Sequence, residues 1–280
     1  MPHKPGRRAS SLAAVVVMTA ALGAGCDEEP AGEITPRRAD PPASAAPSEP
    51  GAAERQAALE SALNEYLDDN PGVSASVSLD VDGSTLHYRD DETFETASIA
   101  KLEILTRWLL LRNGDKLPRH ELDLASRMIT VSDNNAANEL CMTIARATRP
   151  GDVPGGTDAC VDEGLWGEDL TTAADQLAVL NFALDPEGEL DEADRDVVLR
   201  LMGEIADDQN WGVSAAARDG EPSVLKNGWD VRDGGWVVHS VGVVGDDLRL
   251  AILTHGHADV DSGIASVEDI AALTRAALDG

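Results

Sequence analysis

The order of strand-like and helix-like segments is the feature that most constrains the fold of this chain. Two alternating apolar runs, residues 73–81 and 84–88, come early, and Asp82-Gly83 between them is typical of a tight hairpin turn. Three further strand-like runs come late, at residues 223–229, 236–244 and 248–254. A parallel doubly wound sheet would alternate strand and helix throughout. We therefore predict an α+β fold with one antiparallel sheet and a helical insertion.

Helices are indicated where apolar residues recur three and four positions apart. Leu59, Leu63 and Leu67 fall on one face of a helix that begins near Glu54 and ends before Asn70. Further helices are predicted over residues 98–112, 119–130, 135–147, 172–184, 191–205 and 263–278. Residues 148–170 are rich in Gly, Pro and Asp, so a loop is predicted there.

The first 25 residues have the pattern of an export signal. Basic side chains precede a short apolar run at residues 12–22, which is too short to span a bilayer. Leu22-Gly23-Ala24-Gly25-Cys26 resembles a lipoprotein cleavage box, although Gly23 replaces the usual branched apolar residue. We expect cleavage before Cys26, lipidation of its thiol, and an exported lipoprotein anchored in the bacterial cell envelope. An ordinary secretory signal with an incidental cysteine is the alternative.

Residues 26–53 are rich in Ala, Pro, Glu and Ser and show no apolar periodicity, which predicts a disordered tether. Residues 54–280 then form a single domain. Cys141 and Cys160 remain as an even pair, so a disulfide is expected in an exported chain, with two buried free thiols as the alternative.

The formal net charge of −29 excludes nucleic acid as a partner, because phosphate binding needs a basic patch. Such charge also repels anionic substrates at long range. Any anion site must therefore be locally positive and well enclosed. We expect a monomer.

Thr96-Ala97-Ser98-Ile99-Ala100-Lys101 opens one of the predicted helices and has the residues of a nucleophilic site. Residues three apart share a helix face, so the Ser98 hydroxyl and the Lys101 amine are expected side by side. A helix N-terminus favours negative charge, and lysine becomes a base only when burial or another cation lowers its pKa. The pattern alone is not specific, because Ser223-Val-Leu-Lys226 repeats it.

Two further motifs follow in a fixed order. Ser132-Asp133-Asn134 and Lys226-Asn227-Gly228 come after the first motif, an order that marks penicillin-recognising serine enzymes. Over residues 54–280 the chain resembles class A β-lactamases and their relatives. The resemblance is carried by residues 96–101, 132–138, 170–173 and 226–229. It implies a five-stranded antiparallel sheet flanked by helices, with a helical subdomain that is reduced here because the stretch between Ser98 and Ser132 is short.

The resemblance implies catalytic roles for four side chains. Ser98 is expected to be the acylated nucleophile and Lys101 its base or proton partner. Ser132 would pass a proton to the leaving nitrogen, and Lys226 would hold Ser132 and the substrate carboxylate. No cofactor is implied.

Substrate binding is assigned by the same resemblance. Asn134 would bind Lys101 and the substrate amide. Asn227 stands where a hydroxyl residue usually helps bind the substrate carboxylate, and its amide can donate in its place. Gly228 and Trp229 continue this strand, and the backbone N–H groups of Ser98 and Trp229 would form the oxyanion hole.

The glutamate that normally activates the deacylating water in the family is missing, because no Glu-x-x-Leu-Asn precedes Leu170. Glu163 and Glu168 lie in the right loop, either as substitute bases or as solvated loop acids. We therefore expect a long-lived acyl-enzyme. Three functions stay open: β-lactam hydrolysis, D-alanyl-D-alanine peptidase action on cell-wall peptides, and a non-hydrolytic binding or sensing module.

Other chemistry-bearing residues have plainer explanations. The run from His255 to Asp261 resembles a zinc motif, but Val260 replaces its last histidine and a catalytic zinc takes about three protein ligands. We predict a polar loop there and no metal site. His239 is predicted to be a structural strand histidine. Core packing accounts for most of the tryptophans, with Trp229 and Trp236 as candidates to line the pocket.

Overall fold

The computed structural model describes residues 50–147, 152–161 and 166–280, which belong to one compact unit. The predicted export signal, the lipidation site at Cys26, nearly all of the predicted tether and Glu163 lie outside these ranges. The first helix, α1 (Ala52–Asp69), begins slightly before the predicted domain start. Within the described ranges, no helix combines the length and the apolar character needed to cross a membrane.

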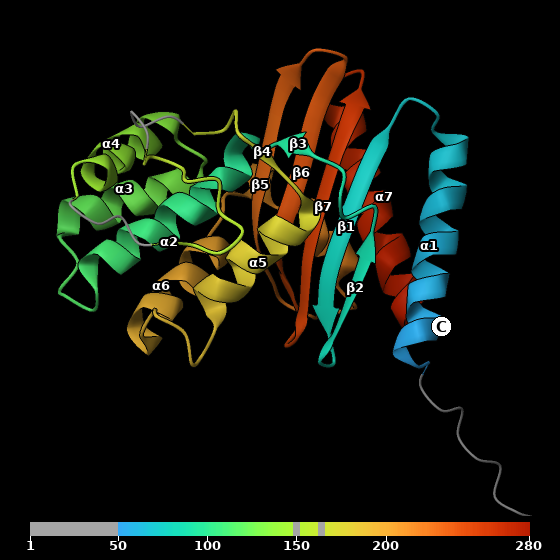
Figure 1. Cartoon of the computed structure of the whole chain (residues 1–280), viewed down its shortest axis with the longest axis horizontal. Coiled ribbons are helices and arrows are strands. Elements are labelled where there is room, and N and C mark those ends of the chain that lie inside the picture. The colour runs from blue at the N-terminus through green and yellow to red at the C-terminus, as the bar shows by residue number, and fades with distance from the viewer. Residues whose placement is uncertain (1–49, 148–151, 162–165) are drawn as a thin grey trace, which may run out of the picture. The chain divides into compact units, whose positions relative to one another are not determined.

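Five strands form one antiparallel sheet in the order β2-β1-β7-β6-β5 (Figure 1). Their bounds are β1 Ser74–Val81, β2 Ser84–Tyr88, β5 Ser223–Arg232, β6 Gly235–Val244 and β7 Leu248–His257. The C-terminal strands run further than the apolar pattern predicts, because polar residues continue the pairing, as Arg232 with Gly235 does beside the β5–β6 turn. The predicted α+β class with an antiparallel sheet is confirmed.

The helices lie on both faces of the sheet. α1 and α7 (Val260–Asp279) cover one face, and α5 (Ala173–Leu184) lies on the other (Figure 1). The rest of the helical insertion extends beyond β5 and consists of α2 Ala100–Arg112, α3 Arg119–Thr130, α4 Asn134–Ala145 and α6 Glu192–Gly203. Only α2 and α3 lie between Ser98 and Ser132, which accords with the reduced subdomain predicted from the spacing.

Short elements complete the chain and were not predicted. Strands β3 (Phe94–Glu95) and β4 (Leu170–Thr171) pair with each other, and three short 3-10 helices are η1 Ala97–Ile99, η2 Asp207–Gln209 and η3 Val213–Ala216. Elements of two to four residues have no periodicity for a sequence pattern to report.

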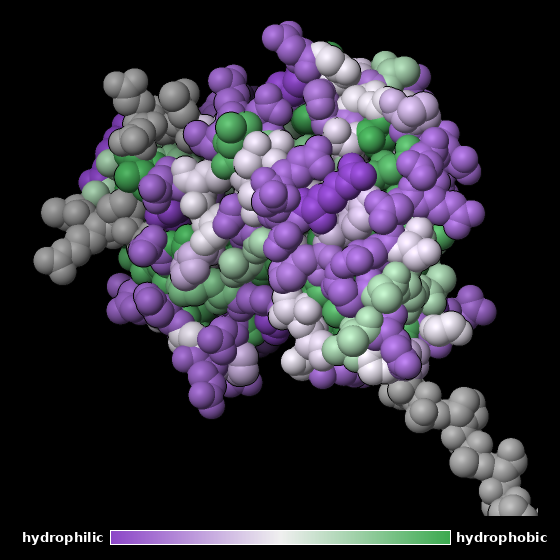
Figure 2. Space-filling model, turned by 45° about the vertical axis from the view of Figure 1, so that its right-hand side comes forward, coloured by the Kyte–Doolittle hydropathy of each residue, from purple (hydrophilic) through white to green (hydrophobic). Residues whose placement is uncertain are grey.

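Each face of the sheet closes its own apolar core, because successive residues of a strand point to opposite sides. In β7, Ala251 and Leu253 belong to the core under the helical insertion, whereas Leu250 and Ile252 belong to the core under α1 and α7. The described surface is mostly hydrophilic on the face that Figure 2 shows, which accords with the strongly acidic composition.

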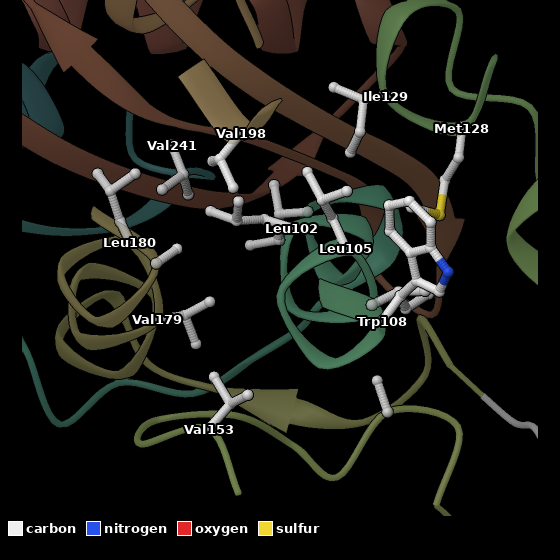
Figure 3. Close-up of a cluster of buried hydrophobic side chains, with 14 of the residues drawn as sticks. Leu102, Leu105, Trp108, Met128, Ile129, Val153, Val179, Leu180, Val198 and Val241 are labelled. Atoms are coloured by element: carbon white, nitrogen blue, oxygen red, sulfur yellow. The ribbon is translucent and has the colours of Figure 1, made fainter. Parts of the chain in front are cut away.

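Helix α2 runs through the centre of the insertion. Every residue from Ala100 to Leu109 is buried, polar ones included. Its apolar side chains pack on their neighbours, and Figure 3 shows Leu105 and Trp108 facing Met128 and Ile129 of α3. The burial of this helix explains why Lys101, in its first turn, lies away from solvent.

Candidate active site

Ser98 lies in a strained turn at the start of α2. The predicted helix start is slightly off: Ser98 is in the 3-10 turn η1, and α2 begins at Ala100. Ala97, just before the serine, has a φ of 44°, a left-handed conformation that side chains other than glycine rarely adopt. The surrounding backbone holds this turn, since the N–H of Ala97 donates to Gly167 O at 2.9 Å and that of Thr96 to Asp169 O at 2.9 Å.

Lys101 lies at the centre of a cluster of oxygen atoms. Its Nζ is 2.8 Å from Ser98 Oγ and 2.9 Å from Ser132 Oγ. It also donates to Ser132 O and to Asn134 Oδ1, each at 2.7 Å. Burial lowers the pKa of Lys101 from 10.5 to about 7, although the Asp133 carboxylate opposes the shift. A substantial fraction of Lys101 is therefore neutral near pH 7, within hydrogen-bond distance of the Ser98 hydroxyl.

Ser132 joins the two lysines of the site. Its Oγ lies 2.9 Å from Lys101 Nζ and 3.2 Å from Lys226 Nζ. Ser132 has a positive φ of 56°, and Asp133 after it caps α4 by accepting from the backbone N–H groups of Asn135 and Ala136. The cap anchors the turn that aims the Ser132 hydroxyl between the amines.

Lys226 is 1% exposed on β5, and its Nζ donates to Asn227 O at 2.6 Å. Burial, and then the positive charge of Lys101, hold the pKa of Lys226 well below its ordinary value. Two buried amines that share one hydroxyl cannot both carry a proton without cost. Proton transfer within this pair is therefore coupled.

Strand β5 passes very close to Ser98 at Gly228. A Cβ atom there would lie 2.7 Å from the Ile99 nitrogen and 2.9 Å from the Ser98 nitrogen. Only glycine allows this approach. The approach brings the Trp229 backbone near Ser98, as the expected oxyanion hole requires. The Trp229 ring packs on Trp211 with centroids 5.8 Å apart.

Asn227 differs from the expectation that its amide donates to a substrate carboxylate. Its side chain is 1% exposed, and its Nδ2 donates to Gln209 O at 2.8 Å and Trp211 O at 3.1 Å. Both amide hydrogens are therefore used inside the protein. In this arrangement the side chain ties β5 to the 209–211 segment and does not face a ligand.

Trp166 is the site residue that the sequence reasoning missed. Lys101 Nζ lies 4.8 Å from the centroid of its ring, and its Nε1 donates to Asn138 Oδ1 at 2.9 Å. The one signal in the sequence was its place in the loop before Leu170, where the resemblance to class A β-lactamases directed the search for a deacylating glutamate.

A pocket of ≈ 220 Å³ opens beside Ser98. It is lined by Ala97, Ser98, Asn134, Trp166, Gly167, Glu168, Trp229, Asp230 and Arg232. Glu168 is exposed on its rim, so this acid shares the pocket with the nucleophile. Arg232 pairs with Asp230 at 2.5 Å and donates to Gly167 O at 3.1 Å, so the Asp230 carboxylate offsets its charge at the mouth.

The loop that leads to Trp166 is fastened to the helical insertion at two points. Cys141 and Cys160 form the expected disulfide between α4 and this loop. Buried Glu103 of α2 accepts from Thr157 N at 2.8 Å and Ala159 N at 3.0 Å, and it pairs with Arg107 at 2.7 Å.

His239 belongs to the sheet and does not line the pocket. His239 Nδ1 accepts from Thr254 N at 3.1 Å, so its Nε2 carries the proton and donates to Glu95 O at 2.9 Å. Burial lowers the pKa of His239 to about 4, as suits a neutral structural side chain.

The zinc-like run is also structural. His255 and His257 lie within β7, where a loop was predicted, and Asp259 caps α7. Among the described residues, no three His, Cys, Asp or Glu side chains are grouped to hold a metal.

Comparison with known proteins identifies the fold. No protein-family model matches the sequence, and no curated protein matches it. A class A β-lactamase of the last common ancestor of Gram-negative bacteria has a TM-score of 0.62 at 21% identity, covering 79% of this chain and 99% of that one. A β-lactamase from Streptosporangium roseum has a TM-score of 0.61 at 20% identity, with 81% and 99% covered. A class A β-lactamase from Mycobacterium abscessus has a TM-score of 0.60 at 18% identity, with 77% and 97% covered. The chain has the class A β-lactamase fold, as its motifs indicated.

Proposed function

We propose that this protein is a serine enzyme that attacks a β-lactam or a related amide through an acyl-enzyme on Ser98. The observation that carries the proposal is the continuous chain of contacts from Ser98 Oγ through Lys101 Nζ and Ser132 Oγ to Lys226 Nζ, with separations of 2.8, 2.9 and 3.2 Å. This chain lies beside a pocket large enough for a small molecule. The class A β-lactamase fold supports the same chemistry.

Acylation can be written with these groups alone. Ser98 Oγ bonds to the carbonyl carbon while its proton passes to the neutral amine of Lys101. Negative charge then develops on the carbonyl oxygen, beside the Ser98 and Trp229 backbone. The carbon–nitrogen bond breaks, the leaving nitrogen takes the Ser132 proton, and the Lys101 ammonium returns a proton to Ser132. The lysine ends neutral and the product is an ester.

A substrate carboxylate would meet two basic side chains in this acidic protein. Lys226 lies beside Ser132, and Arg232 lines the mouth of the pocket. An anion bound near Lys226 would favour its ammonium form and raise its lowered pKa. Arg232 is already paired with Asp230, so the local positive charge for a carboxylate would have to come from Lys226 once the anion is bound.

Release of the acyl group is proposed to be slow. In the described part of the chain, the hydrogen-bond partners of the Lys101 amine are hydroxyl, amide and carbonyl oxygens, with no carboxylate among them. Glu168 is exposed on the pocket rim, so it remains the candidate base within the described residues. General-base assistance is worth about 10²–10⁴-fold, which sets the scale of the expected slowing.

The lack of a carboxylate among the described hydrogen-bond partners of Lys101 also favours a second candidate function. Such a site suits a penicillin-binding peptidase that acts on D-alanyl peptides, or a sensor whose adduct persists. Peptide turnover together with a stable β-lactam adduct would select the peptidase.

We also propose that the protein is held at the cell envelope by lipid on Cys26, on the strength of the leader pattern alone. Detergent partitioning of the full chain tests this. Wild type should enter the detergent phase and Cys26→Ser should stay in the aqueous phase. Equal partitioning of the two proteins would contradict lipidation.

Time-resolved intact-protein mass spectrometry with benzylpenicillin and a cephalosporin tests the main proposal. Wild type should gain one adduct that persists for many minutes, and Ser98→Ala should gain none. Ser223→Ala is the matched control, because Ser223 opens the second Ser-x-x-Lys and lies at the start of β5. Adduct formation by folded Ser98→Ala would refute the assignment.

A further inference from the structure

Trp166 occupies a defined position beside the base of the site. Its ring faces Lys101 Nζ at 4.8 Å, and its Nε1 donates to Asn138 Oδ1 at 2.9 Å. It lines the same pocket as Ser98. The hydrogen bond fixes the ring over the amine from one side, while the oxygens of Ser98, Ser132 and Asn134 surround the amine elsewhere.

The face of an indole ring cannot accept a proton as water or a carboxylate can. It attracts a cation through its quadrupole but offers no lone pair that takes up a proton. A water molecule hydrogen-bonded to Lys101 on the loop side would have to lie where the ring now lies. Burial is the main cause that lowers the pKa of Lys101, and this ring is part of that burial.

We propose that Trp166 is the positioning residue that prolongs the Ser98 acyl-enzyme, by keeping water out of the space beside Lys101. The inference rests on the proposed function and adds to it a named cause for slow release. Trp166 touches neither reacting bond, so it acts through Lys101.

The step that Trp166 would hinder is hydrolysis of the ester. The oxygen of water bonds to the ester carbonyl carbon, and the proton of that water passes to the neutral amine of Lys101. The bond between that carbon and Ser98 Oγ then breaks, and Ser98 Oγ takes the proton back from Lys101. A free carboxylic acid leaves. Water beside Lys101 is the one reactant that the acyl-enzyme does not already contain.

Three variants separate the parts of this inference. Trp166→Ala removes the ring, Trp166→Phe keeps a smaller ring without its N–H, and Asn138→Ala removes the group that holds the indole. Asn135→Ala is the matched control, because Asn135 lies three positions earlier on α4, is exposed like Asn138, and does not line the pocket.

The first readout is the lifetime of the benzylpenicillin adduct, followed by intact mass. Trp166→Ala should shorten the lifetime by about 10- to 100-fold, which lies at or below the range of general-base assistance. Trp166→Phe and Asn138→Ala should shorten it less, and Asn135→Ala should match wild type. An unchanged lifetime in folded Trp166→Ala would overturn the inference while leaving acylation of Ser98 in place.

The second readout needs no substrate, so it tests the inference even if wild type forms no adduct. The amine of Lys101 is titrated by NMR in wild type and in Trp166→Ala. Entry of water should raise the pKa of Lys101 from about 7 towards its ordinary value. A merely structural role for Trp166 would not raise this pKa, because loss of the ring by itself removes its attraction for the ammonium and lowers the pKa. A pKa that does not rise in the folded variant would show that water exclusion is not the main effect of the ring.

Discussion

Glu103 offers the sharpest test of how the Trp166 loop is held, because it is a buried carboxylate with several partners. It is 1% exposed in the first turn of α2. Its oxygens accept from Arg107 Nε at 2.7 Å and from the backbone nitrogens of Thr157 and Ala159 at 2.8 and 3.0 Å. Glu103→Ala removes one partner of a buried ion pair and leaves these backbone donors without their acceptor.

The expected loss of stability follows from these contacts. Breaking a buried ion pair by removing one partner costs about 3–5 kcal/mol. In the variant, Arg107 still has its ion pair with Asp158 at 2.9 Å, so its charge is not left unpaired. We therefore expect a loss at the lower end of this range, about 3 kcal/mol in the free energy of unfolding. Glu103→Gln keeps a side chain of the same length with one acceptor oxygen, so it should lose less stability. In Glu103→Ala/Arg107→Ala the loss should fall short of the sum of the single losses by about 0.5–3 kcal/mol.

Urea unfolding followed by circular dichroism measures these differences, provided the slope of the transition is unchanged. Glu204→Ala is the matched control, since Glu204 and Arg200 are also four positions apart at 3.2 Å but are 54% and 45% exposed. That surface pair should be worth at most about 1 kcal/mol. If Glu103→Ala cost no more than Glu204→Ala, the buried pair would not anchor the loop.

Three further predictions concern the site and the bridge. Acylation of Ser98 should slow as the pH falls below about 7, because the ammonium of Lys101 cannot take the Ser98 proton; a stopped-flow pH series that stays flat would contradict this. Gly228→Ala should lower the acylation rate by about 10²-fold or more while the fold is retained, because its Cβ would meet the Ser98 backbone; wild-type rates would show that β5 can yield. Reduction of the Cys141–Cys160 disulfide, which spans 19 residues, should cost about 3 kcal/mol of stability by calorimetry, and an unchanged melting temperature would argue against it.

The sheet was predictable because its strands have clear patterns. The early hairpin carries alternating apolar residues and the Asp82-Gly83 turn signal, and the three late strands carry apolar runs. Ser98 and Lys101 were predictable as a pair because helix geometry is local. The contact holds although Ser98 lies in a 3-10 turn, since that turn leads directly into α2.

The other features of the site could not be predicted, because they depend on contacts between segments far apart in the sequence. Asn227 points to the 209–211 segment because two backbone carbonyl oxygens there take its amide hydrogens, and no local pattern encodes that choice. Trp166 lies over Lys101 because Asn138 of a distant helix holds its N–H. The tryptophan residue type suggested core packing, and only the path of the loop could show that Trp166 packs on the Lys101 amine.

The strand order of the sheet has a consequence for how the chain matures. The edge hairpin β1–β2 is made early, yet β1 pairs with β7, which begins only at Leu248. The α1 helix likewise waits for α7, which follows β7 in the chain. A growing polypeptide therefore cannot close this sheet until β7 has been synthesised, and contacts this distant slow folding. A protein cut short before β7 would keep the Ser98 and Ser132 motifs in its sequence but would lack the strand that joins the two halves of the sheet.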